Sequence, residues 1–143
     1  EVLLNLAKRV AADGEGASKF VTVNCIKAKS VADAKKICFS ISNSPLVKTA
    51  LAGEDPNWGR IAMAVGKTEI KVEIKKINIS FGPYKIFSKN ELAKDYDEQK
   101  VAEYMKNESI DITVDLGMGQ KSFTSYTMDL TKDYIEINAD YRS

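Results

Sequence analysis

The sequence predicts an α+β fold of two layers, in which a mixed or antiparallel sheet packs against helices. Segments that alternate apolar and polar residues, as strands do, are interspersed with segments that repeat apolar residues at helical spacing. No internal repeat, low-complexity tract or linker interrupts them, and 143 residues with 44% hydrophobic side chains can bury one core. We therefore expect a single domain over residues 1–143.

Helices and one strand are predicted in the first half of the chain. Apolar residues at helical spacing predict a helix over 2–12, and alternation predicts a strand over 19–28. Ser30 is expected to cap a helix that runs to about residue 42, with a buried face made of Val31, Ala34, Ile37, Cys38 and Ile41. A Ser-Pro pair at 44–45 opens another helix to about residue 52, and a third helix ends near residue 65.

Strands dominate the predicted second half. Residues 70–74 and 77–81 alternate with opposite parity, which a bulge near Lys75 and Lys76, or a short loop before a second strand, would reconcile. After a Gly-Pro turn, residues 84–87 form the predicted hairpin partner, and a polar amphipathic helix is predicted over 92–105. A strand over 110–116, a hairpin-like loop at 117–119 and a return strand over 123–128 precede a final helix that starts near residue 130.

Charge and composition exclude several classes of function. Lys and Arg number 21 against 20 Asp and Glu, and they form no basic cluster, so no nucleic-acid partner is expected. No apolar run reaches the roughly 18 residues that a membrane span needs. Because charged residues begin at Glu1, we expect no signal peptide. We expect a cytoplasmic protein with no membrane contact and no cofactor.

The sequence contains no His, which removes Ser-His and Cys-His nucleophile pairs within this chain and most zinc sites. Cys25 and Cys38 fall at core positions of a predicted strand and helix, and we interpret them as buried thiols in a reducing compartment. Any chemistry must therefore use carboxylates, Lys, hydroxyls, amides or groups from another chain.

Two segments between predicted elements hold candidate functional residues. In the first, Gly14 and Gly16 allow the backbone to present the carboxylate of Glu15 at a fixed place, although a helix C-cap with a solvated acid is the plainer alternative. A nucleotide-binding loop is disfavoured, because acids repel phosphate and no phosphate-binding Lys or helix N-terminus follows. In the second, residues 53–60 join two helices, and we interpret Trp58 as packing over the turn while Asp55 pairs with Arg60.

Three runs of residues are more specific: DGEGASKF at 13–20, SPLVKTALAGEDPNWGRI at 44–61 and DLTKDYIEINADYRS at 129–143. In this order they resemble the ornithine acetyltransferase (ArgJ) family, the bifunctional glutamate N-acetyltransferases of arginine biosynthesis. Ser18 and Ser143 stand where Thr is more usual in the family, and both keep a hydroxyl. The resemblance implies that the chain is the C-terminal part of the family's β subunit.

The resemblance also implies a self-processing acyltransferase with an N-terminal nucleophile. The precursor cleaves itself before a Thr, whose free amine then serves as base for its own hydroxyl. Acetyl passes from N-acetylornithine to this Thr and then to glutamate in a ping-pong cycle. Some members also use acetyl-CoA, and an oxyanion hole on the α chain stabilises the tetrahedral intermediate.

The family's Ala-Thr-Met cleavage site is absent from these 143 residues. We therefore expect the nucleophile to lie upstream and the chain to be inactive by itself. The implied partners are the α chain and the N-terminal part of the β chain, assembled as α2β2. The alternative is a non-catalytic module, derived from the family, that binds a small molecule or a partner.

Carried over from the family, the expected substrate contacts are Glu15, Asn138 and Ser143, with no catalytic residue and no metal ligand in this chain. A fixed carboxylate suits an ammonium group, while amide and hydroxyl groups can orient the rest of ornithine or glutamate. The segment Lys48–Arg60 is assigned mainly to structure and to the subunit interface.

Overall fold

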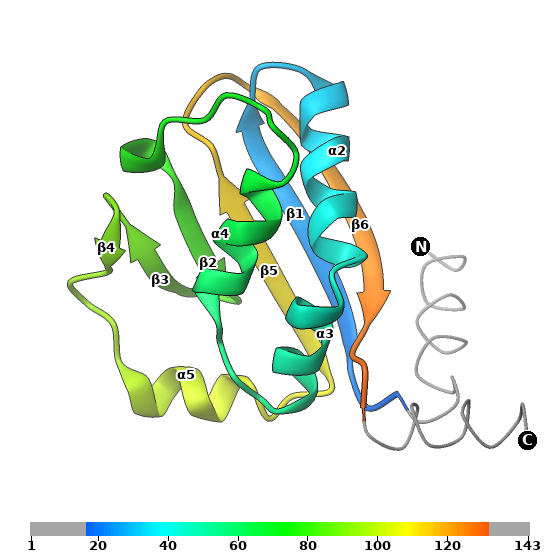
Figure 1. Ribbon diagram of the computed structural model, residues 1–143. Coiled ribbons are helices and arrows are strands. Elements are labelled where there is room, and N and C mark those ends of the chain that lie inside the picture. Colours follow the sequence, from blue (N-terminus) through cyan, green and yellow to red (C-terminus); the bar gives the residue numbers. More distant parts are fainter. Residues whose placement is uncertain (1–16, 132–143) are drawn as a thin grey trace, which may run out of the picture.

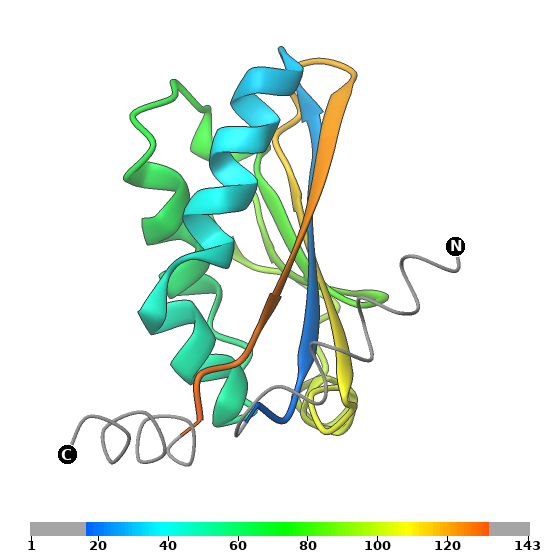
Figure 2. The ribbon, with the colours of Figure 1, turned by 90° about the vertical axis from the view of Figure 1, so that its right-hand side faces the viewer.

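A computed structural model describes residues 17–131 of the chain as a sheet with helices (Figure 1). The strands are β1 (Phe20–Ala28), β2 (Asn78–Phe81), β3 (Tyr84–Ser88), β4 (Glu91–Leu92), β5 (Ser109–Asp115) and β6 (Lys121–Met128). The helices are α2 (Val31–Ser42), α3 (Pro45–Ala52), α4 (Trp58–Gly66) and α5 (Glu98–Tyr104), with a 3-10 turn, η1, at Ile74–Lys76. Seen from the side, α2, α3 and α4 form one layer over the sheet (Figure 2). The predicted two-layer α+β class is confirmed.

Strand β1 lies inside a mixed sheet of order β4-β3-β2-β5-β1-β6. It pairs in parallel with β5, from Phe20 opposite Ser109, and antiparallel with β6, from Phe20 opposite Met128. On the helix-covered face, Val21, Val23 and Cys25 are fully buried. The strand predicted over 19–28 is therefore confirmed, and it is a central strand of the sheet.

Helix α2 begins as the sequence predicts, because the Ser30 side chain accepts a hydrogen bond from the backbone N–H of Asp33. Its residues Ala34, Ile37, Cys38 and Ile41 are fully buried, whereas Val31 is 49% exposed and does not belong to the buried face. At the other end of the helix, the hydroxyls of Ser42 and Ser125 lie 2.6 Å apart and satisfy each other in the interior between the two layers.

The next two helices are also confirmed, and each has a side-chain cap. Ser44 accepts from the N–H of Val47 at the start of α3, where Pro45 occupies the first helical position. Asn57 accepts from the N–H of Arg60 at the start of α4.

The strand predicted at residues 70–74 is wrong. This run is irregular and ends in the 3-10 turn η1, and only the second run forms a strand, β2, which pairs with β3 and β5. Ile70 and Val72 are half-buried against the core, which explains their alternation. Strands β1 and β2 already occupy both sides of β5, so residues 70–74 cannot pair with β5.

The predicted helix over 92–105 forms only in its second half. Leu92 belongs to β4, and the N–H of Ala93 donates to the Ile86 carbonyl, which continues the pairing with β3. Asp97 then caps α5 by accepting from the N–H groups of Gln99 and Lys100. Leu92 and Ala93 therefore pair with β3, although the apolar residues of this segment are spaced as in a helix.

The return strand β6 exists, but it does not form a hairpin with β5. Strand β1 lies between them, so the connecting loop crosses the end of β1. The N–H groups of Met118 and Gly119 both donate to the Lys27 carbonyl at 2.9 Å. A Cβ at Gly119 would collide with the carbonyl oxygen of Ala28, so the crossing requires glycine at this position.

The helices predicted over 2–12 and beyond residue 131 lie outside the described residues. Within residues 17–131, no helix is long and apolar enough to cross a membrane.

We predict that Gly119→Ala destabilises the full-length protein by about 1–3 kcal/mol, because the added methyl meets backbone atoms that cannot move aside. Chemical denaturation gives the free energy of unfolding. Gly66→Ala is the matched control: it ends α4, no atom lies within 4 Å of the added methyl, and the change should cost nothing. Equal stabilities for the two variants would contradict the role assigned to Gly119.

Candidate functional site

The three runs that carry the family resemblance meet at one corner of the described structure. This corner, the motif junction, lies where β1 begins, β6 ends and α3 passes beside them (Figure 1). We define it by Ser18, Lys19, Lys48, Glu54 and Asp129, which come from all three runs. Since up to 111 positions separate them in the sequence, only the fold brings them together.

Asp129 joins the first run to the third. Its Oδ1 accepts from the backbone N–H groups of Ser18 and Lys19, both at 2.9 Å, and its Oδ2 accepts from the Ser18 hydroxyl at 2.5 Å. Asp129 is only 3% exposed, so these donors replace water around a buried carboxylate. The antiparallel pairing of β1 with β6 creates this contact, because it places the start of one strand beside the end of the other.

Lys19 joins the first run to the second. Its side chain is 6% exposed, and its ammonium lies 3.1 Å from Glu54 Oε2 and 2.9 Å from the Asn107 carbonyl oxygen. Glu54 follows α3 with a φ of 57°, a left-handed conformation that turns the chain toward Lys19. The third contact is between the backbones of the third and second runs, where the N–H of Leu130 donates to the Lys48 carbonyl at 3.1 Å.

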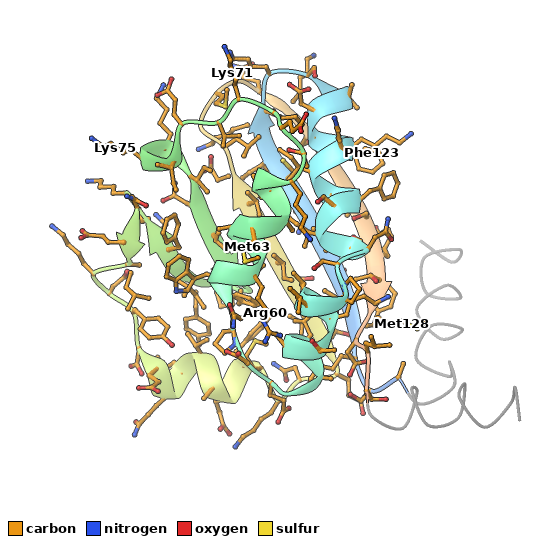
Figure 3. The ribbon with its side chains drawn as sticks, in the orientation of Figure 1. Arg60, Met63, Lys71, Lys75, Phe123 and Met128 are labelled. Atoms are coloured by element: carbon orange, nitrogen blue, oxygen red, sulfur yellow. The ribbon has the colours of Figure 1, made fainter. Side chains whose placement is uncertain are left out.

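The remainder of the second run holds helices α3 and α4 together. Arg60 lies between them (Figure 3) and donates to the Leu46 carbonyl at 2.7 Å and to the Thr49 hydroxyl at 3.2 Å. The predicted pairing of Arg60 with Asp55 is therefore wrong, and Asp55 instead accepts from the Asn57 amide. Trp58 stacks on Phe87 of β3 at a centroid distance of 4.7 Å, so it packs on the sheet.

The predicted substrate contacts Glu15, Asn138 and Ser143 lie outside the described residues. The structure brings together Ser18, from the same run as Glu15, and Asp129, the first residue of the run that contains Asn138 and Ser143. Sequence reasoning had passed over Asp129, Lys19 and Glu54 as site residues. A usable signal was available for Asp129, because it is the acid that directly follows the alternation of a predicted strand.

The cysteines are buried free thiols, as predicted. Burial, with smaller contributions from Cys38 and nearby carboxylates, raises the pKa of Cys25 to about 12. Burial also raises the pKa of Cys38, an effect that hydrogen bonds from the Cys25 backbone and from Ser125 only partly oppose. Because the thiolate is the reactive form, neither thiol is a nucleophile at neutral pH.

Within residues 17–131, no group of three or more His, Cys, Asp or Glu residues could hold a metal ion. The motif junction instead offers hydroxyl, carboxylate, ammonium and backbone amide groups, and most of them are bonded to each other. Such an arrangement holds chain segments in place.

The fold and the motif junction together define a two-layer α+β domain in which described residues of three separated motifs meet at one corner. The chain belongs to the ArgJ family, whose family model matches residues 1–143. It is 51% identical over its whole length to the arginine biosynthesis bifunctional protein ArgJ of Bradyrhizobium diazoefficiens, and 49% identical over 99% of its length to that of Caulobacter vibrioides. In both cases the chain spans 35% of the relative's length.

A solved structure has the same fold. It is the crystal structure of arginine biosynthesis bifunctional protein ArgJ from Bacillus halodurans, with a TM-score of 0.88 and 36% sequence identity. The similarity covers 96% of this chain and 64% of that chain.

We predict that Glu54→Gln destabilises the full-length protein by about 1–2 kcal/mol, because it leaves the buried Lys19 ammonium without its counter-charge. The double variant Lys19→Met/Glu54→Gln should be less destabilised than the sum of the single variants, since it removes the buried charge as well. Chemical denaturation measures all three.

Glu103→Gln is the control for this cycle. It breaks the exposed pair between Lys106 and Glu103, with side chains 64% and 75% exposed, and should leave the free energy of unfolding nearly unchanged. Additive effects of Lys19→Met and Glu54→Gln would show that Lys19 and Glu54 are not coupled.

Proposed function

We propose that this chain is part of a glutamate N-acetyltransferase of arginine biosynthesis, which moves acetyl from N-acetylornithine to glutamate. The observation that carries the proposal is membership of the ArgJ family along all 143 residues. The names of the relatives add support, since they are bifunctional proteins of arginine biosynthesis. Because the chain spans 35% of their length, the activity belongs to the whole protein.

The reaction needs a nucleophile that this chain does not supply. The chain has no His to activate a hydroxyl, and burial raises the pKa of both thiols. We propose that the nucleophile is the N-terminal Thr of the β chain, upstream of the residues shown, and that its own amine takes the hydroxyl proton. An oxyanion hole on the α chain completes the site in an α2β2 assembly.

The acetyl group moves in two steps. The Thr Oγ attacks the amide carbonyl of N-acetylornithine, an acetyl ester forms, and the amide bond breaks as ornithine leaves with a proton on its amine. The amine of glutamate then attacks the ester, which yields N-acetylglutamate and restores the Thr hydroxyl. Acetyl-CoA would enter at the first step with its thiol as the leaving group.

Glu15, Asn138 and Ser143 are the proposed substrate contacts. Both substrates are amino acids that carry charged groups, and N-acetylornithine keeps a free side-chain ammonium. A carboxylate can bind such a cation, while the Asn amide and the Ser hydroxyl orient the remaining polar groups. The motif junction supports this assignment, because it joins the segment that follows Glu15 to the segment that precedes Asn138.

Two measurements on the full-length protein test the function. Intact-mass analysis should find two chains, split before a Thr. The purified protein should release ornithine from N-acetylornithine as the acetyl ester forms, and it should yield N-acetylglutamate over repeated turnovers when glutamate is supplied. A single uncut chain without acetyl transfer would favour the alternative, a module that binds without catalysis.

We predict that Glu15→Gln lowers kcat/KM for N-acetylornithine by an amount corresponding to about 1.5–3 kcal/mol, because a charge-assisted hydrogen bond to the substrate is lost. Self-cleavage should be unchanged, since Glu15 takes no part in it. Steady-state kinetics with N-acetylornithine measure the effect.

Glu73→Gln is the control for Glu15→Gln. Glu73 is 65% exposed and pairs with Lys76 three residues away, so its loss should leave the kinetics unchanged. Wild-type kcat/KM in the Glu15 variant would remove Glu15 from the substrate site.

A further inference from the structure

Within residues 17–131, the sheet ends on one side in β4 and on the other in β6 (Figure 1). An edge strand presents a row of unpaired backbone groups, and proteins that leave an edge in water shorten it, interrupt it or add charges to it. Strand β4 has two residues and follows a turn in which Lys89 and Asn90 have φ values of 53° and 64°. Strand β6 has eight residues, no proline and one charged residue, Lys121, at its start. Strand β6 is therefore built like an inner strand.

The backbone bonds of β1 show which groups of β6 face outward. The N–H of Phe20 donates to the Glu108 carbonyl, and the Ile26 carbonyl accepts from the N–H of Leu116, so both even-numbered residues bond toward β5. Successive residues of a strand direct their N–H and C=O groups to opposite sides. The odd-numbered residues of β1 therefore bond toward β6.

In β6, the residues opposite these odd positions are Phe123, Ser125 and Thr127. Their N–H and C=O groups bond to β1, so the backbone groups of Thr124 and Tyr126 point away from β1 and toward the edge. Within the described residues, no strand lies beyond them. The edge thus offers donors and acceptors at alternate residues, which is what a further strand needs for pairing.

The side chains of β6 bond inward and leave these backbone groups open. On the face away from α2, the Thr124 hydroxyl donates to Asn24 Oδ1 at 2.9 Å, and the Tyr126 ring stacks on Phe20 at a centroid distance of 5.7 Å. On the other face, the Thr127 hydroxyl donates to a carbonyl of α2 at 2.9 Å. Each of these side chains is thereby held against β1 or α2, on the side away from the edge.

Aromatic rings are exposed on both faces beside this edge. Tyr126 is 47% exposed on one face. On the other face, Phe123 (Figure 3) lies 5.7 Å from Phe39 of α2, which is 41% exposed. Side chains of a paired strand alternate between the two faces and would meet these rings. Main-chain hydrogen bonds combined with side-chain contacts on both faces are the mode of β-strand addition.

We propose that β6 pairs with a further β-strand that the same protein supplies from outside these 143 residues, so that the sheet continues past β6. This inference rests on the proposal that the chain is part of a longer ArgJ protein. The chain spans 35% of the length of its ArgJ relatives, so most of such a protein lies outside it. A strand of the same protein is present at high effective concentration, whereas a second copy has to be recruited from solution.

The described structure begins next to this edge strand. The N–H groups of Ser18 and Lys19 donate to Asp129, which directly follows β6. The chain that leads into β1 therefore enters beside the end of β6. This placement favours a strand from the preceding part of the protein as the partner of β6.

Hydrogen exchange of the full-length protein, resolved to single amides, is the first test. We expect the amides of Thr124 and Tyr126 to exchange at least about a hundredfold more slowly than in an unstructured peptide, because a partner strand bonds them. Ser125 is the internal control, since its N–H bonds to β1 and exchanges slowly with or without a partner strand. Fast exchange at Thr124 and Tyr126 beside slow exchange at Ser125 overturns the proposal.

Photo-cross-linking of the full-length protein identifies the partner strand. The photoreactive residue p-benzoylphenylalanine replaces Tyr126, which exchanges one aromatic ring for another at an exposed position. We expect the main product to join this position to a peptide outside residues 1–143. Leu92, 51% exposed on the short edge strand β4, is the matched position and should give about tenfold less product. A main product with a second copy of β6 or with another segment of residues 1–143, or a yield no higher than at Leu92, contradicts the proposal.

The outcomes separate this inference from the proposed function, because acetyl transfer is assayed on the same protein. Slow exchange and the expected cross-link without acetyl transfer would support the pairing of β6 and overturn the function. Acetyl transfer with fast exchange at the edge, or without the expected cross-link, would overturn only the pairing of β6. A native protein with no residues beyond these 143 would overturn both.

Discussion

Strand β1 has a parallel neighbour on one side and an antiparallel neighbour on the other, and it also carries Val21, Val23 and Cys25 beneath α2. The parallel pairing with β5 requires the chain to pass from one end of the sheet to the other before it pairs again. Helices α2, α3 and α4 lie in the part of the chain that connects β1 to β5. The antiparallel pairing with β6 then returns the chain to the end where β1 began, which is why the motif junction exists at all.

Two charged groups at this corner, Asp129 and Lys19, are buried, and each is bonded to several partners at once. Asp129 receives three hydrogen bonds, and the Lys19 ammonium has a carboxylate and a carbonyl within 3.1 Å. In the described part of the chain, no buried side-chain nitrogen or oxygen lacks a partner. Buried polar groups that are fully satisfied resist displacement, because each alternative arrangement leaves a desolvated group unpaired.

The described residues of the motif junction therefore form a scaffold that holds separated chain segments together. The buried thiols have raised pKa values, Lys19 pairs with Glu54, and Asp129 accepts hydrogen bonds from Ser18 and Lys19. A scaffold of this kind fits the proposal that the nucleophile comes from the remainder of the protein. Two residues of the longest run also make contacts within the domain. Arg60 donates to a carbonyl of α3, and Trp58 stacks on Phe87 of β3.

The sequence by itself determined the elements whose signals are local. Ser30, Ser44 and Asn57 cap helices through their own side chains, and the alternation over 19–28 and 110–116 marks strands because half-burial imposes that period. The motifs likewise identified the family. Only the tertiary structure decided which strands pair: β1 separates β5 from β6, and residues 70–74 are half-buried without a strand partner. It also decided that Asp129 meets Ser18, since a contact across 111 positions depends on sheet order, which no local pattern encodes.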